Sequence, residues 1–527
     1  MTLKLVAFVG LLLVAGPVEA RGDSLRPHVV VILADDLGYG DPACYGGKIP
    51  TPHLDRLARE GMRFTDAHTP SAVCTPTRYG LLTGRYNWRT KLQRGVLGGL
   101  SPRLIEPGRV TIASFLHEQG YRTACVGKWH LGMDWVRKPG QKVTELNIEP
   151  REQVWNVDYN QPIANGPNSV GFDEYFGISA SLDMVPYTFL RNDRVTVDPT
   201  EDREFLMMEG RPNGGKTRKG PTAPGFDARD VLPAVVREAR EFIGRQTKPD
   251  ANGKPFFLYV PLPAPHTPIL PTAEWQGKSG MNPYADFVMQ TDAAVGSILA
   301  ALEESGVGKE TLVIVTSDNG CSPQAKFEEL EKLGHNPSGP LRGHKADLFE
   351  GGHRVPFLVR WPGRVDAGKE SSKLVCLTDV LATIAEVIHK PLPETAGEDS
   401  FSFLSALQTG EVKPETESAK GRASLVSHSI NGSFAIRKGP WKLLICADSG
   451  GWSPPRPDGK AAKGLPPLQL YHLADDLAES RNVAAEHPDL VEELKELIEG
   501  IVRRGRSTPG ADQQNAVPVE LRFPKWP

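Results

Sequence analysis

The 527-residue sequence predicts an α/β protein, with a large three-layer domain on a mostly parallel sheet and a smaller α+β domain after it. From Pro27 to about Lys390, short apolar β-branched segments alternate with segments of helical periodicity, which is typical of layered α/β domains. After residue 395 the pattern changes to short antiparallel strands and one charged amphipathic helix. A chain of this length also exceeds the usual size of one hydrophobic core. We therefore place the two domains at residues 27–394 and 395–527.

The larger domain opens with HVVVILADD (28–36), a continuous apolar run that predicts a strand buried on both faces. A helix is expected over PHLDRLAREG (52–61), with Thr51 placed to cap its start. Helices and strands then alternate along the chain. Further helices are expected at 111–120, 231–244, 285–306 and 376–388, and further strands at 121–127, 255–262, 311–320 and in LVRWPG (358–363). The polar stretches 135–170 and 190–225 lack periodicity, which predicts long surface loops.

The smaller domain is expected to contain an antiparallel sheet and one helix. Its strands are predicted in SLVSHSI (424–430), SFAIRKGPWKLLIC (433–446) and LQLYHL (468–473). The loop 448–467 interrupts them, and the charged amphipathic segment 488–505 predicts a helix. This order of elements is typical of an α+β domain.

The first twenty residues have the composition of a secretory signal peptide. Lys4 provides the positive charge near the start, and LVAFVGLLLVAG forms the apolar centre. The segment VEA, which ends at Ala20, has the small residues of a cleavage site. The apolar run is too short to span a bilayer, and no later segment approaches that length. We therefore expect residues 1–20 to be removed, leaving a secreted or periplasmic protein that is not an integral membrane protein.

Composition and cysteine spacing exclude several classes of protein. With 24% charged residues and a net charge of −3, the chain has no polybasic character, and we expect no nucleic-acid partner. The six cysteines lie far apart without a C-x-x-C pair, which argues against a disulfide scaffold and a zinc cluster. Cys74 differs from the others because prolines flank it and Arg78 follows four residues later.

Acidic and amide side chains end two of the predicted buried strands. Asp35 and Asp36 close the first strand, and Asp318 and Asn319 close the strand at 311–320. In an open α/β sheet, ligands bind at the carboxyl ends of the strands. Three carboxylates gathered there would repel one another unless a cation neutralised them, and hard oxygen donors favour Ca²⁺ or Mg²⁺ over zinc. The alternative is that both pairs only form turns or cap helices.

Lysines and histidines also follow predicted strands. In VGKWHLG, Lys128 and His130 lie two residues apart and face the same side if the chain is extended. His266 lies in the proline-rich LPAPHTP, and Lys345 precedes a Gly-Gly turn. Each residue alone is more often an ordinary surface or capping residue. Together with the carboxylates they predict a pocket for a tetrahedral oxyanion, in which lysine and histidine bind oxygens and move protons.

The residues around Cys74 argue against two kinds of thiol chemistry. A cysteine protease needs a base and an oxyanion hole, but it leaves the acidic pairs and the prolines unexplained. A cysteine phosphatase loop needs an arginine six residues after the cysteine, where this chain has Gly80. C-T-P-T-R instead fits the C-x-P-x-R core of the type I sulfatase signature, and CTPTRYGLLTGR fits its extended form.

Other motifs follow in that family's order between residues 28 and 364: LADDLGYGD, GYRTACVGKWHLG, PAPHTP, TSDNG and GHKADLFEGGHRVPFLVRWPG. The segment LQLYHLADDLAESRNVAAEHP also resembles the family's C-terminal region. The chain therefore resembles an arylsulfatase-like type I sulfatase of the alkaline phosphatase superfamily. The resemblance implies an alkaline-phosphatase-like fold and a sulfuric ester hydrolase that acts on a sulfated carbohydrate or a small aryl sulfate.

The resemblance also implies a modified nucleophile and a metal ion. A maturation enzyme would oxidise Cys74 to formylglycine, whose hydrated aldehyde attacks sulfur with one hydroxyl and expels sulfate through the other. Asp318 would accept the proton of the attacking hydroxyl. One divalent cation is implied, Ca²⁺ with Mg²⁺ as the alternative. Its implied ligands are Asp35, Asp36, modified Cys74, Asp318 and Asn319.

The remaining motif residues would bind the sulfate and move protons. Arg78 would help to polarise the diol. Lys128, His266 and Lys345 would bind the sulfate oxygens, and His266 or Lys345 would protonate the leaving alcohol. His130 would remove the proton from the second hydroxyl. Every one of these motif positions carries the residue that the family requires.

Two other functions stay open at this point. A phosphodiesterase or phosphonate hydrolase of the same superfamily can use the same nucleophile and metal. A secreted glycan-binding protein would leave Cys74 unmodified and could stack a sugar on Trp452 in the 448–467 loop, although ordinary packing suits that residue equally well. The intact set of motif residues argues against a non-catalytic protein.

Overall fold

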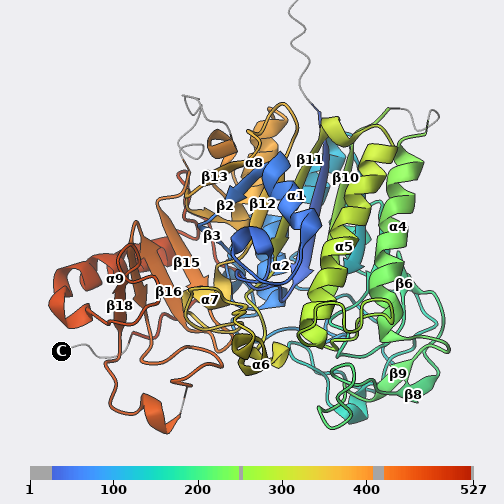
Figure 1. Ribbon diagram of the computed structural model, residues 1–527, viewed down its shortest axis with the longest axis horizontal. Helices are drawn as coiled ribbons and strands as arrows, with labels where there is room; N and C mark the ends of the chain where they lie inside the picture. Colours follow the sequence, from blue (N-terminus) through green and yellow to red (C-terminus); the bar gives the residue numbers. More distant parts are fainter. Residues whose placement is uncertain (1–25, 249–252, 408–420, 458, 524–527) are drawn as a thin grey trace, which may run out of the picture.

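A ten-stranded sheet forms the centre of the larger part of the molecule, with its strands in the order β13-β2-β12-β11-β1-β10-β4-β5-β6-β7 (Figure 1). The structure is a computed structural model and describes residues 26–248, 253–407, 421–457 and 459–523. The predicted signal peptide at residues 1–20 lies outside the described residues.

Four parallel strands lie next to one another in the middle of this sheet. They are β11 (Thr311–Ser317), β1 (His28–Asp35), β10 (Phe256–Pro265) and β4 (Arg122–Lys128). The register places Val31 of β1 opposite Ile314 on one side and Tyr259 on the other. Every residue of β10 and β11 is buried, as their apolar sequences predict. The carboxyl ends of the four strands therefore meet at one edge of the sheet.

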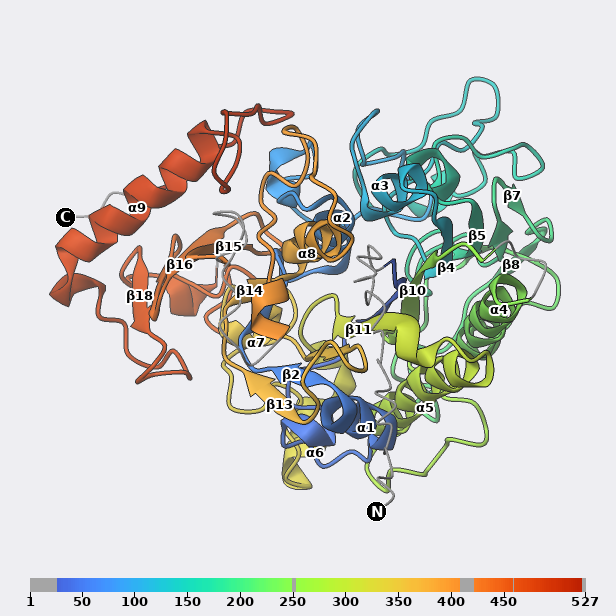
Figure 2. The ribbon, with the colours of Figure 1, turned by 90° about the horizontal axis from the view of Figure 1, so that it is seen from above.

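Helices cover both faces of the sheet and form the three predicted layers (Figure 2). One face carries α1 (Pro52–Glu60), α4 (Val231–Gln246) and α5 (Pro283–Glu304). The other face carries α2 (Cys74–Thr83), α3 (Ile112–Glu118) and α8 (Val380–Val387). Along β1, Val29 and Val31 pack in the core that contains α2, α3 and α8, whereas Val30 and Ile32 pack in the core that contains α1, α4 and α5. Alternate side chains of one strand therefore serve both layers.

Short strands extend the sheet on both sides and form two small extra sheets. These strands are β2 (Met62–Phe64), β3 (Ala67–His68), β5 (Glu174–Ile178), β6 (Leu190–Arg191), β7 (Arg194–Val195), β8 (Glu201–Arg203), β9 (Gly220–Thr222), β12 (Phe357–Arg360), β13 (Lys369–Ser371) and β14 (Val375–Cys376). β12 contains the strand expected in LVRWPG and runs antiparallel to β11. The prediction of unbroken loop over 190–225 is wrong where β6 to β9 form. Strands of two or three residues are too short to show an alternating pattern.

The start of α1 differs from the sequence prediction. Thr51 occupies the capping position, but its side chain does not cap the helix; its hydroxyl oxygen accepts a hydrogen bond from the main-chain N–H of Ala43 at 2.8 Å. Asp292 of α5 caps α1 instead, because its carboxylate accepts from the N–H groups of His53 and Leu54 at 3.1 and 2.8 Å. Burial raises the pKa of Asp292 to about 7. A capping residue supplied by another helix cannot be read from local sequence.

Helix α5 has the length and composition of a membrane span, although the sequence analysis found no later segment of that kind. Its 22 residues reach a mean hydropathy of 1.2 within one 18-residue window. However, 78% of that window is buried inside the molecule, where α5 packs against α1, α4 and β10. The apolar surface of α5 is therefore covered by the protein's own core.

A four-stranded antiparallel sheet and a long helix form the smaller part of the molecule, at the left of Figure 1. Its elements are β15 (Ser424–His428), β16 (Phe434–Lys438), β17 (Trp441–Leu444), β18 (Gln469–His472) and α9 (Pro488–Arg503). Val491 and Leu494 of α9 pack in one cluster with Ile436 of β16 and Leu470 of β18. The α+β arrangement is the one that the sequence predicts. Two short helices, α6 (Phe327–Lys332) and α7 (Glu350–His353), lie in the loops after β11.

Segments after residue 394 connect the two parts of the molecule. Phe403 and Leu407 pack into the larger core. The chain after α9 returns to the larger part, where the side-chain oxygen of Asn515 accepts from Arg89 at 2.8 Å and the N–H of Ala516 donates to the Arg89 carbonyl at 2.8 Å. Arg89 therefore lies at the junction between the two parts.

The ion pair between Arg89 and Asp399 stabilises this junction. Both side chains are fully buried, and the guanidinium donates to the two Asp399 oxygens at 2.8 Å each. We predict that Asp399→Ala lowers the free energy of unfolding by about 3–5 kcal/mol, because it leaves a buried guanidinium without its counter-charge. The measurement is chemical denaturation. Glu486→Ala, which breaks an exposed pair with Arg481, is the control and should change stability by less than about 1 kcal/mol.

Candidate active site

Side chains from four strands gather at the carboxyl edge of the sheet. Asp35 ends β1, Lys128 ends β4, His266 follows β10, and Asp318 and Asn319 follow β11. His266 is 8% exposed, and the other four residues are fully buried. The residues that the sequence placed after separate strands therefore share one site.

Helix α2 brings Cys74 and Arg78 to the same site. Cys74 is the first residue of α2, and every residue of this helix is buried. The amino end of a helix favours an anion, since its N–H groups and dipole point towards that end. The Arg78 guanidinium donates to one Asp318 oxygen at 3.0 and 2.7 Å, and to the Lys128 carbonyl at 3.1 Å. Arg78 therefore ties α2 to the ends of β11 and β4.

Asp35 and Asp36 each have a lysine partner. The ammonium nitrogen of Lys128 is 2.6 Å from Asp35 Oδ2, and that of Lys345 is 2.5 Å from Asp36 Oδ1. Asn319 also donates to Asp36 Oδ1, at 2.6 Å. Lys345 comes from the loop before α7, far from the sheet in sequence. The structure thus brings all the predicted cations against the predicted carboxylates.

Carbonyl groups fix the tautomers of both histidines. His130 Nε2 lies 2.8 Å from the Leu97 carbonyl and must donate to it, so Nδ1 is unprotonated. Within the described ranges, His130 Nδ1 is buried and has no hydrogen-bond partner. His266 Nδ1 in turn lies 2.6 Å from the Thr267 carbonyl, while its Nε2 is 3.7 Å from Asp36 Oδ2. Both rings therefore present one defined nitrogen to the site.

Burial and neighbouring charges shift the pKa values of the site. Burial, with Lys128 and Arg78, holds the pKa of His130 well below its usual value, so this ring is neutral. Burial opposes ionisation of Asp35, but Lys128 and the other cations outweigh it and hold the Asp35 pKa well below its usual range. Burial and the Asp35 carboxylate raise the pKa of Asp318 to about 7. Burial also raises the pKa of the Cys74 thiol, which is therefore neutral near pH 7.

The charges of the site correct one sequence argument. The carboxylates of Asp35, Asp36 and Asp318 face three cationic side chains, those of Arg78, Lys128 and Lys345. The cluster therefore does not depend on a metal ion alone for neutralisation, contrary to the sequence argument. The sequence analysis placed these lysines in one pocket with the carboxylates, but the pairing of each cation with one carboxylate depends on tertiary structure.

Three oxygen atoms nevertheless have the character of metal ligands. Asp35 Oδ1, Asp36 Oδ2 and Asn319 Oδ1 are buried and have no hydrogen-bond partner in the part of the chain that the structure describes. Buried oxygens without partners are costly, and hard oxygen donors of this kind suit Ca²⁺ or Mg²⁺. Ligand atoms of Asp35, Asp36 and His266 also lie within 4.8 Å of one another. The residues present therefore fit a divalent cation.

A second cluster of possible ligands, formed by His68, Glu350 and His353, does not fit a cation as well. The ammonium nitrogen of Lys442 is 2.9 Å from Glu350 Oε1 and 3.1 Å from His353 Nε2. Lys442 also lies 2.8 Å from Glu479. Because Lys442 already supplies a positive charge to this cluster, we interpret the cluster as a buried ion-pair network between the two parts of the molecule.

Comparison with known proteins agrees with this geometry. The sulfatase family matches residues 27–390. The chain belongs to the sulfatase family. It is 34% identical to an N-acetylgalactosamine-6-O-sulfatase of Bacteroides thetaiotaomicron, over 92% of this chain and 94% of the relative. It is 33% identical to arylsulfatase A of Homo sapiens, over 92% and 89% of the two chains.

A solved structure gives the same result for the fold. A Bacteroides thetaiotaomicron protein, described under the metabolism of multiple glycosaminoglycans, has a TM-score of 0.75 and 33% identity to this chain. The match covers 90% of this chain and 99% of that one. This protein is therefore a type I sulfatase of the alkaline phosphatase superfamily and a sulfuric ester hydrolase, and the predicted fold class is confirmed.

The sequence analysis missed the segment of this sulfatase that holds His130. The Leu97 carbonyl accepts from His130, and the Leu97 N–H contacts the Thr75 hydroxyl oxygen at 3.3 Å. The Gly98-Gly99 pair directly after Leu97 could have indicated, from sequence alone, that the main chain is tightly packed here. A Cβ on Gly99 would lie 1.8 Å from the carbonyl oxygen of Val185, so only glycine allows this close approach.

The sequence analysis also missed how the loop with Trp452 is attached to the sulfatase site. Asp347, two residues after Lys345, accepts from the N–H groups of Trp452 and Ser453 at 2.7 and 3.0 Å. The other Asp347 oxygen accepts from the N–H of His344 at 2.9 Å. Trp452 itself is 36% exposed. One buried carboxylate thus joins the turn that carries Lys345 to a loop that exposes an aromatic ring.

Proposed function

We propose that this sulfatase is an exported enzyme that removes sulfate from carbohydrate sulfate monoesters with a formylglycine made from Cys74. The position of Cys74 carries the proposal: it starts a buried helix, and Arg78 from the same helix reaches Asp318. A buried, neutral thiol is a weak nucleophile, so the unmodified side chain is poorly suited to attack sulfur. The helix end and the nearby lysines suit a bound sulfate.

The modified side chain would supply two hydroxyl groups. Oxidation by a maturation enzyme gives an aldehyde, and hydration gives a geminal diol. One hydroxyl oxygen bonds to sulfur as the bond from sulfur to the alcohol oxygen breaks. The second hydroxyl then loses its proton, the bond between carbon and the sulfate oxygen breaks, sulfate leaves with the electron pair, and the aldehyde re-forms. A serine would lack the second hydroxyl and would retain the sulfate.

The residues of the site have complementary roles in this proposal. Asp318, which accepts from Arg78 on one oxygen and from the Asp36 N–H on the other, would take the proton of the attacking hydroxyl. Lys128 and Lys345, which donate to carboxylates in the structure, would donate to the sulfate oxygens instead. His266 or Lys345 would protonate the leaving alcohol.

His130 would act in the second step. Its ring is neutral, and its unprotonated Nδ1 has no hydrogen-bond partner within the described ranges. A neutral imidazole nitrogen can take the proton of the second hydroxyl, which drives the departure of sulfate. The hydrogen bond from Nε2 to Leu97 holds this tautomer.

The proposed cofactor is one Ca²⁺, with Mg²⁺ as the alternative. Asp35, Asp36, Asp318 and Asn319 would hold it together with the modified side chain of residue 74. The three oxygens that lack a hydrogen-bond partner within the described residues support this assignment. When bound, such a cation polarises the attacking hydroxyl and the sulfate oxygens.

Two observations support an exported enzyme that acts on carbohydrate. Relatives that match most of the chain include N-acetylgalactosamine-6-sulfatases, one of them 34% identical. Residues 1–20 have the composition of a signal peptide, and such a segment would take the enzyme to where sulfated polysaccharides occur.

The first test concerns the reaction class. We predict that the wild-type enzyme hydrolyses 4-nitrophenyl sulfate faster than a nitrophenyl phosphodiester, and that Cys74→Ala abolishes both activities without unfolding the protein. Cys44→Ala is the control, because Cys44 is a free, partly buried thiol whose main chain pairs with Asp55 and Arg63 and, among the described residues, with no residue of the site. Full activity in Cys74→Ala would refute the assigned nucleophile, and faster phosphodiester hydrolysis would indicate a phosphodiesterase.

The second test concerns the metal. We predict that chelation lowers both activity and the thermal midpoint, because a ligand that binds only the native state stabilises it, by about 2.7 kcal/mol at one hundred times its Kd. Asp36→Ala should contain less metal by elemental analysis. Asp41→Asn is the matched control, since Asp41 is also buried near the end of β1 but pairs with His335 and Tyr284. Unchanged metal content in Asp36→Ala would count against these ligands.

The third test separates the two histidines. We predict that His266→Ala slows sugar sulfates more than 4-nitrophenyl sulfate, because a sugar hydroxyl leaves poorly unless an acid protonates it. His130→Ala should release a burst of about one equivalent of alcohol and then stall as sulfated enzyme. Single-turnover kinetics on both variants provide the measurement. Equal losses on both substrates and no burst in either variant would mean that the roles are divided differently.

A further inference from the structure

A cavity of about 480 Å³ lies beside His266, and its size is that of a small-molecule site. Thr267, the residue after His266, forms part of its wall. The rest comes from the hairpin around residues 207–214 and from residues 324–329, which follow the metal-site residue Asn319 along the chain. The cavity therefore begins one residue away from a group that faces the sulfate site.

The walls of this cavity are fixed to the core of the fold. The Ile269 N–H donates to the Met207 carbonyl at 2.8 Å, and the Glu209 N–H donates to the Ile269 carbonyl at 2.9 Å. On the opposite wall, the Asn282 side chain donates to the Ala325 carbonyl at 2.9 Å. These bonds hold one wall against the segment that follows His266 and the other against Asn282 at the start of α5, so the cavity has a defined shape.

The chemistry of the cavity suits a sugar with an acidic group. Arg211 and Lys326 bring positive charge to its wall, and Asn213 and Gln324 bring side-chain amides. Arg211 is 2.8 Å from Glu329, an ion pair that crosses the cavity and offsets one charge. Lys326 is exposed, and in the described part of the chain it has no acidic partner within ion-pair distance. One cation therefore remains available to a ligand.

The backbone of Lys326 lies in the left-handed region, with φ 66° and ψ 62°. This conformation ends the short 3-10 helix Pro323–Ala325, where the Lys326 N–H donates to the Pro323 carbonyl. The main chain of Lys326 is therefore fixed at the cavity wall.

We propose that this cavity binds the sugar adjacent to the sulfated one, and that Lys326 pairs with a carboxylate or a second sulfate on it. The proposal rests on the proposed carbohydrate substrate and adds to it the charge of the neighbouring sugar. Cation and anion would pair at an exposed surface away from the reacting atoms, so the interaction sets the KM for acidic oligosaccharides rather than the rate of the chemical step.

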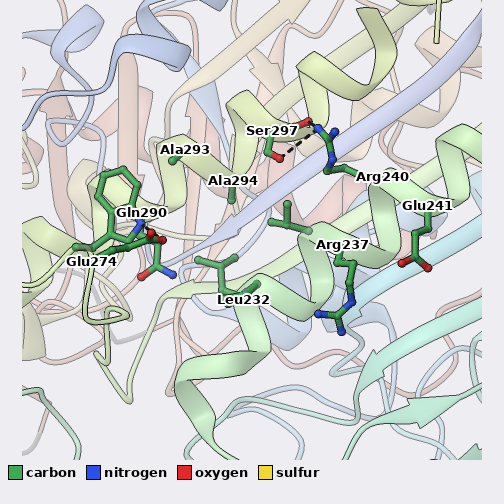
Figure 3. Close-up of a pocket in the computed structure, with 12 residues that line it drawn as sticks. Leu232, Arg237, Arg240, Glu241, Glu274, Gln290, Ala293, Ala294 and Ser297 are labelled. Carbon is green, nitrogen blue, oxygen red and sulfur yellow. Dashed lines mark hydrogen bonds between the residues drawn. The ribbon is translucent and has the colours of Figure 1, made fainter. Parts of the chain in front are cut away.

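A cavity of about 420 Å³ between α4 and α5 supplies the comparison (Figure 3). Arg240 in this cavity donates to the Ser297 carbonyl at 2.7 Å and pairs with Glu304 at 2.9 Å, so its charge is already balanced by an acidic side chain. Arg237 is exposed there. Arg237→Gln therefore serves as the control variant. It removes an exposed positive charge from the wall of the cavity between α4 and α5, and it leaves the cavity beside His266 unchanged.

The test measures kcat and KM for four substrates: 4-nitrophenyl sulfate and three sulfated disaccharides. In the disaccharides, the sugar next to the sulfated one is a uronate, a second sulfated sugar or a neutral sugar. We expect Lys326→Gln to raise the KM for one or both acidic disaccharides up to about fivefold, the upper end of what an exposed ion pair contributes. The other two substrates should change less than twofold, and Arg237→Gln should change none. The acidic disaccharide whose KM rises shows whether Lys326 pairs with a carboxylate, with a sulfate, or with both.

Glu329→Gln provides a test in the opposite direction. It removes the acidic partner of Arg211, so the KM for the responsive acidic disaccharide should fall, and added salt should weaken that gain by screening. Equal changes for acidic and neutral disaccharides, or no change in either variant, would overturn the proposed subsite. If the wild-type enzyme fails to cleave 4-nitrophenyl sulfate and all three disaccharides, the proposed function itself fails, which distinguishes the two outcomes.

Discussion

Charge balance at the carboxyl edge of the central sheet is the constraint on which the rest of the structure depends. Asp35, Asp36 and Asp318 are buried there, and an isolated buried carboxylate would be very costly. Each has a cation from a distant segment: Lys128 for Asp35, Lys345 for Asp36 and Arg78 for Asp318. The pair between Arg78 and Asp318 fixes the position of α2 relative to the strands, and with it the position of Cys74.

Lys128 and Lys345 can pair with carboxylates when the site is empty and with a sulfate when metal and substrate are bound. In the structure, Lys128 and Lys345 donate to carboxylates that each retain one oxygen without a hydrogen-bond partner among the described residues. A divalent cation among those oxygens would take over part of the pairing, and the ammonium groups could then turn to a sulfate. A metal ion would compete with the lysines for the carboxylates, and a sulfate would compete with the carboxylates for the lysines, so metal binding and sulfate binding would favour each other through electrostatics.

Much of this arrangement could be predicted from the sequence, because it follows from local patterns. Buried parallel strands such as β1 and β11 are continuous apolar runs, and polar residues at their ends meet by topology. Helix α2 was not predicted as a helix, because burial on all sides leaves it without amphipathic periodicity. The partner of His130 is a main-chain carbonyl, that of Leu97, and the cap of α1 comes from Asp292 of another helix. Contacts of this kind depend on tertiary packing, which one sequence does not reveal.

The central claim is that residue 74 acts as an aldehyde, and its most direct test is the dependence of activity on the extent of that modification. Preparations made with graded amounts of a formylglycine-generating enzyme will differ in the fraction of peptide that is about 18 Da lighter than the cysteine form. We predict that kcat per protein rises in proportion to this fraction and extrapolates to zero where the fraction is zero, with KM unchanged. Activity that is independent of the fraction, or present in protein that contains only the thiol, would contradict the account.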